Sequence, residues 1–375
     1  MKRMKKLMGI FTALVLAFAV VSCSNGSGDD NQNQGPSTKV ELSAIGNVYS
    51  FDYTGDYDLA NVIDAELTTE TELLEYFEDH ISAWQIANAN GANLSINLEG
   101  IGCCSIAADN AGEAGGKIFG RNFDYKNGTA IIIHTKPATG YESVSTSYPK
   151  FITGHRNWAP VENPTTEDEM INNAVAIGAI YVPMDGMNEK GFYISILEAG
   201  DEEYTAQVEE GKTKIQTTVA VRYLLDKADS VDKAVKILKD FNMYSVHGTA
   251  YHYAMADNTG KAVVVEWINN EMKVTDAKVV TNHYLTPDSG KTAPDENNGS
   301  VIRYNAAMNA GEAANWNMTP EQMRDALKAA KAITEEGSSV CSIWSAVYEP
   351  SAKRINYYFR EDYTKYAEVT FGASN

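Results

Sequence analysis

Two short stretches decide how this chain is interpreted: Gly102-Cys103-Cys104-Ser105-Ile106 and Gly120-Arg121-Asn122-Phe123-Asp124. The first places a thiol directly after a glycine, and the second carries a guanidinium and a carboxylate on a stretch that is typical of a β-strand. A cysteine acts in catalysis as its thiolate, so it needs a nearby base or cation. Cleavage of the chain before Cys103 would supply a base, because a released α-amino group has a reference pKa of about 7.7–8.0. We therefore expect the chemistry of the chain between residues 102 and 124.

The N-terminus has the form of a bacterial export signal. Basic residues precede a largely apolar run at positions 8–21, which is too short for a transmembrane helix. Val20-Val21-Ser22-Cys23 resembles a lipobox, in which the cysteine is lipidated and becomes the mature N-terminus. The alternative is an ordinary signal peptide cut near Ser22. We expect residues 1–22 to be removed, Cys23 to anchor the protein in the membrane through lipid alone, and the protein to reside in the cell envelope, facing outward or the periplasm.

Composition narrows the class of partner and of site. The net charge is −19, and removal of the four basic residues in the signal (Lys2, Arg3, Lys5 and Lys6) leaves about −23. Such an acidic chain argues against nucleic-acid binding. The six histidines are scattered without ligand spacing, so we expect neither a metal nor a cofactor. Three cysteines remain after Cys23, an odd number for an exported protein, and a bridge between adjacent Cys103 and Cys104 would be strained.

The pattern of apolar residues predicts an α+β fold. Residues 23–40 are polar and form the predicted tether, and residues 41–102 form an N-terminal segment ahead of a catalytic domain at residues 103–375. We expect helices over residues 70–84 and 217–227, a helix capped by Ser230, and one that begins with the capping box Thr319-Pro320-Glu321-Gln322. We expect strands at residues 48–53, 118–123, 130–135, 174–182, 191–197, 251–256, 262–267, 340–348, 355–359 and 367–371. Residues 288–300 read as a polar surface loop. Strands grouped before and after helices favour antiparallel sheets layered against helices.

Five blocks in one order resemble a known family. They are Gly102-Cys103, Gly120-Arg121-Asn122-Phe123-Asp124, Asp185-Gly186-Met187-Asn188-Glu189-Lys190-Gly191, Val280-Thr281-Asn282-His283 and Ser300-Val301-Ile302-Arg303-Tyr304. Together they are similar to the choloylglycine hydrolase and acid-ceramidase-like group of N-terminal-nucleophile amidases. That group includes bile salt hydrolases, penicillin V acylases, N-acylethanolamine acid amidase and penicillin acyltransferases. The resemblance spans residues 100–360.

The resemblance implies a four-layer αββα sandwich and a set of roles. Cys103 would be the N-terminal nucleophile, exposed by autocleavage at Gly102–Cys103. Asp124 would hydrogen-bond its α-amino group, and Arg121 would lie beside the sulfur and favour the thiolate. Asn282 would donate to the oxyanion of the tetrahedral intermediate. Arg303 would complete the polar network around the base.

Two positions depart from the family pattern. The place that often holds a second oxyanion asparagine aligns near Glu198, whose carboxylate would oppose an oxyanion. Either a backbone N–H replaces that donor or the alignment is shifted by one or two residues. The second departure is the double cysteine, since the nucleophile is either Cys103 or Cys104. The preceding Gly102 and the following Ser105 favour Cys103.

The same residues also have structural interpretations. The cysteines at 103, 104 and 341 would serve as buried apolar residues, because reduced cysteine is among the most buried residue types. Arg121 and Asp124 would form an ion pair three residues apart at a strand end. We interpret His252 and His283 as structural, because the proposed mechanism needs no imidazole.

Three functions follow in order of preference. The first is hydrolysis of the C–N bond of a linear N-acyl amide, with residues 24–102 retained as a small subunit. Its substrates would be N-acyl amino acids, bile-salt conjugates, penicillin V or acyl-homoserine lactones, among which the sequence does not choose. The second is acyl transfer to an amine on the same fold. The third is a non-catalytic lipoprotein that binds a ligand or peptide, which would show no self-cleavage.

Overall fold

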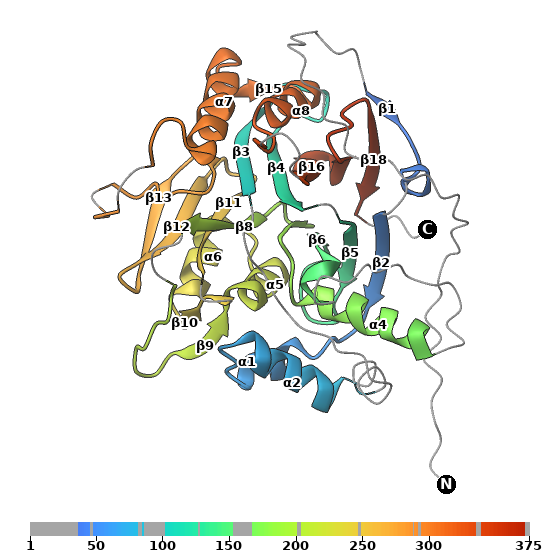
Figure 1. Cartoon of the computed structure of the whole chain (residues 1–375), viewed down its shortest axis with the longest axis vertical. Helices are drawn as coiled ribbons and strands as arrows, with labels where there is room; N and C mark the ends of the chain where they lie inside the picture. The colour runs from blue at the N-terminus through green and yellow to red at the C-terminus, as the bar shows by residue number, and fades with distance from the viewer. Residues whose placement is uncertain are drawn as a thin grey trace.

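The computed structural model describes residues 37–45, 48–81, 85, 102–126, 128–152, 167–200, 204–246, 249–287, 289–291, 294–334 and 339–371. The predicted signal peptide, Cys23 and most of the predicted tether lie outside these residues. Figure 1 shows the remainder as two stacked sheets with helices on their outer sides. This is the αββα arrangement expected above.

The first sheet has eight strands and carries the residues of the opening motifs. In spatial order it contains β1 (Thr38–Lys39), β18 (Lys365–Thr370), β17 (Arg354–Phe359), β16 (Val340–Glu349), β4 (Lys117–Lys126), β3 (Gly102–Asn110) and β14 (Val279–Val280), with β15 (Asn317–Met318) also paired to β3. Its outer face is covered by α7 (Gly299–Ala313), which contacts β3, and by α8 (Pro320–Ala329), which contacts β4 and β16.

The second sheet also has eight strands. Their order is β13 (Glu271–Asp276), β12 (Ala262–Ile268), β11 (Ala250–Ala256), β8 (Tyr193–Gly200), β7 (Asp185–Asn188), β6 (Ser143–Ser147), β5 (Ala130–Lys136) and β2 (Val48–Thr54). Helix α5 (Thr217–Lys227) contacts β7 and β8, and α4 (Glu167–Ile180) contacts β5 and β6. The remaining elements are α1 (Leu59–Asp64), α2 (Glu70–His80), α6 (Val231–Leu238), the parallel pair β9 (Thr213–Gln216) and β10 (Phe241–Tyr244), and single 3-10 turns at 42–44, 149–151 and 350–352.

The part of the chain before Gly102 contributes an edge strand to each sheet. β1 pairs in parallel with β18, and β2 pairs in parallel with β5 over its full length. Thr38 and Lys39, at the end of the predicted tether, therefore already belong to the folded protein. Tyr57, which follows β2, is buried and donates a hydrogen bond to Asp226 of α5. The segment is thus built into the fold on which the rest of the chain packs.

Local sequence signals explain several helix ends. Thr319 and Gln322 form the expected capping box of α8, with Pro320 in the first turn. Ser230 caps α6 by accepting a hydrogen bond from the backbone N–H of Lys233. Helix α5 has the expected bounds. Helix α2 ends at His80, before the expected end, because Ile81 adopts an extended backbone.

The expected strand at residues 174–182 is wrong. These residues lie mainly in α4, and the strand that precedes the Asn188–Gly191 turn is β7. Ala174, Val175 and Ala179 are all fully buried, so the run shows neither alternation nor a single helical stripe. A short run of continuous apolar residues is compatible with either a buried helix or a buried strand. The turn itself is a hairpin as predicted, and Gly191 adopts a positive φ of 79°.

Helix α7 was not expected. The predicted loop ends at Asn298, whose side chain caps the helix through the backbone N–H of Ser300. The buried residues of α7 are mainly small or polar, Ser300, Arg303, Ala307 and Gly311, so no apolar stripe marks it in the sequence.

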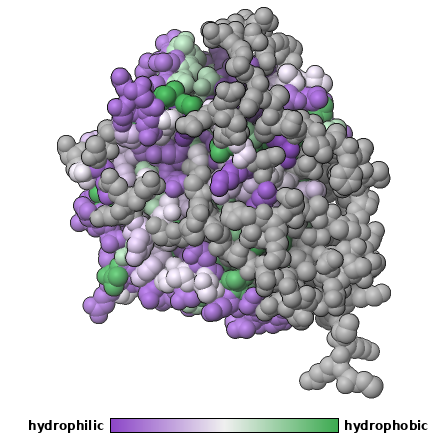
Figure 2. All heavy atoms as spheres, viewed as in Figure 1, coloured by the Kyte–Doolittle hydropathy of each residue, from purple (hydrophilic) through white to green (hydrophobic). Residues whose placement is uncertain are grey.

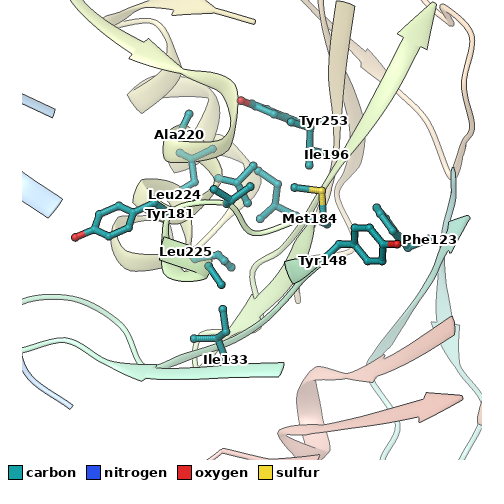
Figure 3. Packing of buried hydrophobic residues seen from close by; sticks show 14 of the residues in the cluster. Phe123, Ile133, Tyr148, Tyr181, Met184, Ile196, Ala220, Leu224, Leu225 and Tyr253 are labelled. Carbon is teal, nitrogen blue, oxygen red and sulfur yellow. The ribbon is translucent and has the colours of Figure 1, made fainter. Parts of the chain in front are cut away.

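Aromatic and aliphatic side chains fill the space between the sheets. Phe123 of β4 stacks on Trp344 of β16, with ring centroids 4.0 Å apart. Figure 3 shows Phe123 and Tyr148 at one end of the buried cluster and residues of α5, which covers the outer face of the second sheet, at the other. The two sheets are also joined by a hydrogen bond of 2.9 Å between the hydroxyls of Thr146 and Tyr357. The core therefore lies on both faces of β4, which is buried along almost its whole length.

The described surface is mostly polar. In Figure 2 the coloured part of the visible face is largely hydrophilic, with scattered apolar residues. In the part of the chain that the structure describes, no helix is long and apolar enough to cross a bilayer.

Candidate active site

Alternation along β3 separates the two adjacent cysteines. Cys103 pairs in register with Phe123 and packs in the core between the two sheets. Cys104 pairs with Asn122 and packs on the opposite face, among residues of the layer formed with α7 and α8. Both side chains are fully buried thiols. Only Cys103 therefore shares the inner face of the sheet with Arg121.

Arg121 is held rigidly beside the Cys103 thiol. Its Nε lies 3.3 Å from Asp185 Oδ2, and its Nη2 donates to the carbonyl oxygen of Ile196 at 3.0 Å. Asp185 is itself fully buried and accepts from Trp344 Nε1 at 2.9 Å and from the Tyr348 hydroxyl at 2.6 Å. Arg121 Nη1 makes no hydrogen bond to any N or O atom of the described residues.

Two opposing effects act on the Cys103 thiol. Burial raises its pKa to about 12, and the Arg121 guanidinium partly opposes this by stabilising the thiolate. The carboxylate of Asp124 raises the pKa further. With the Gly102–Cys103 peptide bond intact, the thiol is therefore protonated at neutral pH.

Asp124 lies directly across the strand pair from Gly102. A Cβ atom placed on Gly102 would lie 2.9 Å from Asp124 Cβ and 3.2 Å from its Oδ2. Asp124 Oδ1 accepts from the Ser342 hydroxyl at 2.6 Å. Its Oδ2 accepts no hydrogen bond from the residues described and lies 3.7 Å from Arg303 Nε. Burial raises the pKa of Asp124, while Arg303 and the Ser342 hydroxyl lower it.

Asn282 and Arg303 complete the cluster at the backbone nitrogen of Cys103. The Cys103 N–H donates to Asn282 Oδ1 at 2.7 Å, and Arg303 Nη2 donates to the same oxygen at 2.6 Å. Asn282 Nδ2 donates to the carbonyl oxygen of Glu198 at 2.9 Å. Thus the side chain of Asn282 bridges β3, α7 and β8.

A second polar network fixes the loop that carries Asn282. The Asn282 N–H donates to Ser300 Oγ at 2.7 Å. The ring of His252 lies between Glu266 and the Thr281 carbonyl oxygen, at 3.1 and 2.8 Å. Glu266 also accepts the backbone N–H groups of Leu285 and Thr286. His252 therefore has a structural place, as interpreted from the sequence.

Comparison with known proteins decides the family. The family described as acyl-coenzyme A:6-aminopenicillanic acid acyl-transferase matches residues 176–363, half of the 375-residue chain. The chain belongs to this family. The acyl-transferase family match includes Asp185, Asn282 and Arg303, and ends before the C-terminal strand β18. No curated protein sequence matched the chain.

Solved structures share the fold of this acyl-transferase family member. Two variants of a conjugated bile acid hydrolase from Clostridium perfringens align with TM-scores of 0.51 and 0.50 at 16% and 19% identity. Each alignment covers 73% of this chain, and it covers 94% and 93% of the respective hydrolase. A penicillin V acylase from Agrobacterium tumefaciens aligns with a TM-score of 0.47 at 15% identity, over 68% of this chain and 83% of the acylase. The family match thus assigns the chain to the acyl-transferase family, and the two hydrolase structures with TM-scores of 0.50 and 0.51 show that it shares their fold.

The structure places the site residues predicted from the sequence around Cys103, except for Cys23, which lies outside the described residues. Gly102, Cys103, Arg121 and Asp124 lie on the adjacent strands β3 and β4, and Asn282 accepts hydrogen bonds from the Cys103 N–H and from Arg303. The structural interpretation of Arg121 and Asp124 as partners at a strand end is wrong. The two side chains lie on opposite faces of β4, because Arg121 bonds Asp185 in the core and Asp124 bonds Ser342.

Sequence reasoning missed the residues that hold the cluster. Asp185 stood inside a recognised block without a role, and Ser342 stood only inside a predicted strand. Glu198 pairs in register with Tyr251, next to a register shift in the β8–β11 pair. Its backbone carbonyl accepts a hydrogen bond from Asn282 Nδ2.

Two motif asparagines are structural in this acyl-transferase family member. Asn122 of β4 donates to the carbonyl oxygens of Leu327 and Ala330, at the end of α8. Asn188 of β7 donates to those of Leu225 and Ala228, at the end of α5. Each sheet thus binds the exposed carbonyls at the end of its covering helix.

Proposed function

We propose that this chain is the precursor of an exported linear amide hydrolase that cleaves itself between Gly102 and Cys103. Cys103 then serves as the N-terminal nucleophile. The bond cleaved in the substrate is the C–N bond between an acyl group and an amine. The family match and the shared fold support the reaction class, and the finer assignment rests on the geometry around Cys103.

One observation carries the proposal: the groups required by an N-terminal nucleophile converge on both ends of Cys103. The side chain lies on the same face as Arg121, whose charge favours the thiolate. The backbone nitrogen already donates to Asn282. Asp124 Oδ2, beside Gly102, accepts no hydrogen bond among the described residues and is therefore available to an α-ammonium group.

The proposed reaction moves one proton between the ends of Cys103. The free α-amino group takes the thiol proton, and the sulfur attacks the substrate carbonyl carbon. The tetrahedral intermediate then expels the amine, which leaves with that proton, and water hydrolyses the thioester. Asn282 is the proposed oxyanion donor. Its Nδ2 is bonded to the Glu198 carbonyl before cleavage, so this role requires that bond to open.

The uncut chain stores the nucleophile in an inactive form. Its thiol is fully buried and its pKa is raised to about 12 by that burial. Cleavage frees the α-amino group, which becomes positively charged when it takes the proton of the thiol in the same residue. We propose that residues 24–102 stay bound as a small subunit, and that Cys23 carries a lipid that anchors the enzyme to the bacterial envelope.

Intact mass of the protein spanning residues 24–375 tests self-cleavage directly. The wild type, Cys103→Ala and Cys104→Ala are compared after purification at neutral pH. Cleavage at Gly102–Cys103 in the wild type and in Cys104→Ala, but not in Cys103→Ala, is the expected result. Three uncut chains would refute the mechanism and favour the ligand-binding lipoprotein. Loss of cleavage in Cys104→Ala alone would move the nucleophile to Cys104.

The substrate class is tested with a panel. Penicillin V, a glycine-conjugated bile salt, N-acyl amino acids and acyl-homoserine lactones are incubated with the cleaved enzyme, and released amine or lactone is measured. Turnover has to disappear in Cys103→Ala. Metabolic labelling with an alkyne fatty acid, lost in Cys23→Ala, tests the lipid anchor.

The description of the matched family favours acyl transfer as a second candidate. Both reactions pass through the same thioester and differ in whether water or an amine attacks it. Adding hydroxylamine during turnover distinguishes the two reactions. The thioester then partitions between water, which gives the free acid, and hydroxylamine, which gives the hydroxamate. Hydroxamate formed at the expense of free acid, with a total rate unchanged, indicates an acyl-enzyme open to amine acceptors.

A further inference from the structure

Strand β16 contains one extra residue where it pairs with β4. Ser342 pairs with Asp124 and Trp344 pairs with the adjacent Phe123, so Ile343 has no partner on β4. In a regular strand, residues two apart point to the same face. This bulge resets the alternation, and Ser342 and Trp344 therefore point to opposite faces of the sheet.

On the outer face, the bulge delivers a hydroxyl to Asp124. Ser342 Oγ accepts the backbone N–H of Ala332, just after α8, at 3.1 Å. Its own hydrogen is directed at Asp124 Oδ1, 2.6 Å away, because an ionised carboxylate only accepts. The backbone N–H of Ser342 donates to Glu361, which also pairs with Lys331. Ser342 is thus fixed from three directions.

On the inner face, the same bulge serves Arg121. Trp344 stacks on Phe123 and donates through Nε1 to Asp185 Oδ2 at 2.9 Å. That oxygen also receives Arg121 Nε. Without the extra residue, Ser342 and Trp344 would point to the same face of the sheet. Either Ser342 would then reach Asp124 or Trp344 would reach Asp185, but not both.

We propose that Ser342 is a positioning residue for the nucleophile. It holds Asp124 Oδ1, so that Oδ2 faces the α-nitrogen of Cys103 and keeps the released amine in place. The inference rests on the function proposed above. It adds a residue that neither the sequence motifs nor the roles implied by the resemblance include.

The charges around Asp124 set the direction of the expected effect. Arg303 of α7 and Arg121 of β4 lower the pKa of Asp124, as does the Ser342 hydroxyl, while burial and Glu361 raise it. Loss of the hydroxyl therefore raises the pKa of Asp124 and also frees its rotation. Both effects weaken its hold on the α-ammonium group, so the thiolate of the cleaved enzyme forms at higher pH.

Ser345 provides a matched control. It lies on the same strand, is buried, and donates its hydroxyl at 2.6 Å to Asn122, whose amide nitrogen is bonded to carbonyl oxygens at the end of α8. Ser342→Ala and Ser345→Ala each remove one buried hydroxyl from β16. Ser342→Thr retains the hydroxyl and tests rescue.

The experiment measures alkylation of Cys103 by iodoacetamide in the self-cleaved enzyme between pH 5 and 9. The labelled N-terminal peptide is quantified by mass spectrometry, and thermal melts report folding. In Ser342→Ala we expect the rate near neutral pH to fall by at least about tenfold and the acid limb to move to higher pH. Ser345→Ala should retain the wild-type pH profile, and Ser342→Thr should recover most of the rate.

The outcomes distinguish a failure of the role of Ser342 from a failure of the proposed function on which it rests. A wild-type chain that never splits at Gly102–Cys103 removes the proposed function and this role together. A wild type that splits, beside a folded Ser342→Ala with the same alkylation profile, overturns the role of Ser342 alone. Equal shifts in Ser342→Ala and Ser345→Ala also overturn it, because they would reflect general loosening of β16. If Ser342→Ala does not fold, Ser342→Gly takes its place because it also removes the hydroxyl: an acid limb displaced to higher pH supports the role, and a wild-type limb contradicts it.

Discussion

Gly102 is the residue at which the smallest change should have the largest chemical effect. A methyl group there would lie 2.9 Å from Asp124 Cβ, a separation that real Cβ atoms essentially never show. Gly102→Ala therefore displaces the carboxylate from the scissile bond. We expect self-cleavage, followed by intact mass, to slow by at least about tenfold. Cys104→Ala changes the next residue on the same face and should cleave at the wild-type rate. Equal rates in both variants would show that Asp124 has room to move.

Asp185→Asn is the single substitution that we expect to lower the free energy of unfolding most. It is fully buried and opposes the charge of Arg121. Asp185→Asn leaves that guanidinium without a counter-charge, which costs about 3–5 kcal/mol in the free energy of unfolding. The matched change Asp109→Asn removes the partner of Lys117 at the surface and should cost under about 1 kcal/mol. Urea unfolding of the uncut Cys103→Ala chain measures the free energy of unfolding with each substitution added. Similar losses for Asp185→Asn and Asp109→Asn would contradict the argument that burial makes the Asp185 pair the more costly one to break.

Turnover distinguishes the proposed role of Asn282 from a structural one. If its amide donates to the oxyanion, Asn282→Ala lowers kcat by about 10²–10³ while KM changes little. The measurement uses whichever amide of the panel the wild type hydrolyses. A rise in KM with unchanged kcat would instead assign Asn282 to uniform substrate binding.

The residues of the candidate site could be named from the sequence because they stand in recognisable blocks. Their partners could not. Nothing in the sequence indicates that Ser342 faces Asp124, because the outcome depends on one extra residue in β16. The alternation of β3 does predict that Cys103 and Cys104 face opposite sides. Which side holds Arg121 follows only from the pairing with β4.

Among the elements, the pairing of β2 with β5 contains a pH-sensitive contact. His134 of β5 lies 3.2 Å from Asp52 of β2 and 2.6 Å from Glu142, whose other oxygen is 3.9 Å from Lys136. The hydrogen bond to Asp52, followed by that to Glu142, raises the pKa of His134 above its ordinary value of 6.5. A raised histidine pKa stabilises the fold fully below the unfolded value. That stabilisation is lost as pH rises through the folded value.

We therefore expect the wild-type free energy of unfolding to fall more than that of His134→Gln between pH 6 and 8. Both proteins carry Cys103→Ala, so that each unfolds as one chain, and urea titrations at several pH values give the comparison. Parallel pH dependences in the two proteins would show that His134 contributes nothing to this pairing.

Helices with capping signals were predictable, and the buried helix was not. The capping box at Thr319 and the N-cap at Ser230 satisfy backbone groups that any helix of this kind exposes, so their signal is local. Residues 174–180 of α4 are apolar, and all of them except the half-buried Ile177 are buried. Tertiary burial there removed the periodicity on which sequence interpretation depends.

At the scale of the whole molecule, cleavage should cut the chain without separating its parts. The part of the chain before Gly102 supplies β1 to one sheet and β2 to the other, and Tyr57 is buried against α5. After cleavage, we expect the fragments ending at Gly102 and beginning at Cys103 to coelute in gel filtration at neutral pH. They should separate only in denaturant. Elution of the catalytic fragment alone would show that the small subunit is a discarded propeptide.

The burial of the thiols would protect the uncut chain if it is exported into an oxidising environment, as proposed above. Oxidants attack the thiolate, and burial raises the pKa of both Cys103 and Cys104 to about 12. The folded, uncut chain therefore presents almost no thiolate to peroxide, and Cys341 is buried as well. The proposed self-cleavage would end this protection for Cys103 alone. Under that proposal, Cys103 becomes susceptible to sulfenic acid formation in the same step that activates it, so oxidative inactivation would accumulate with the time since cleavage.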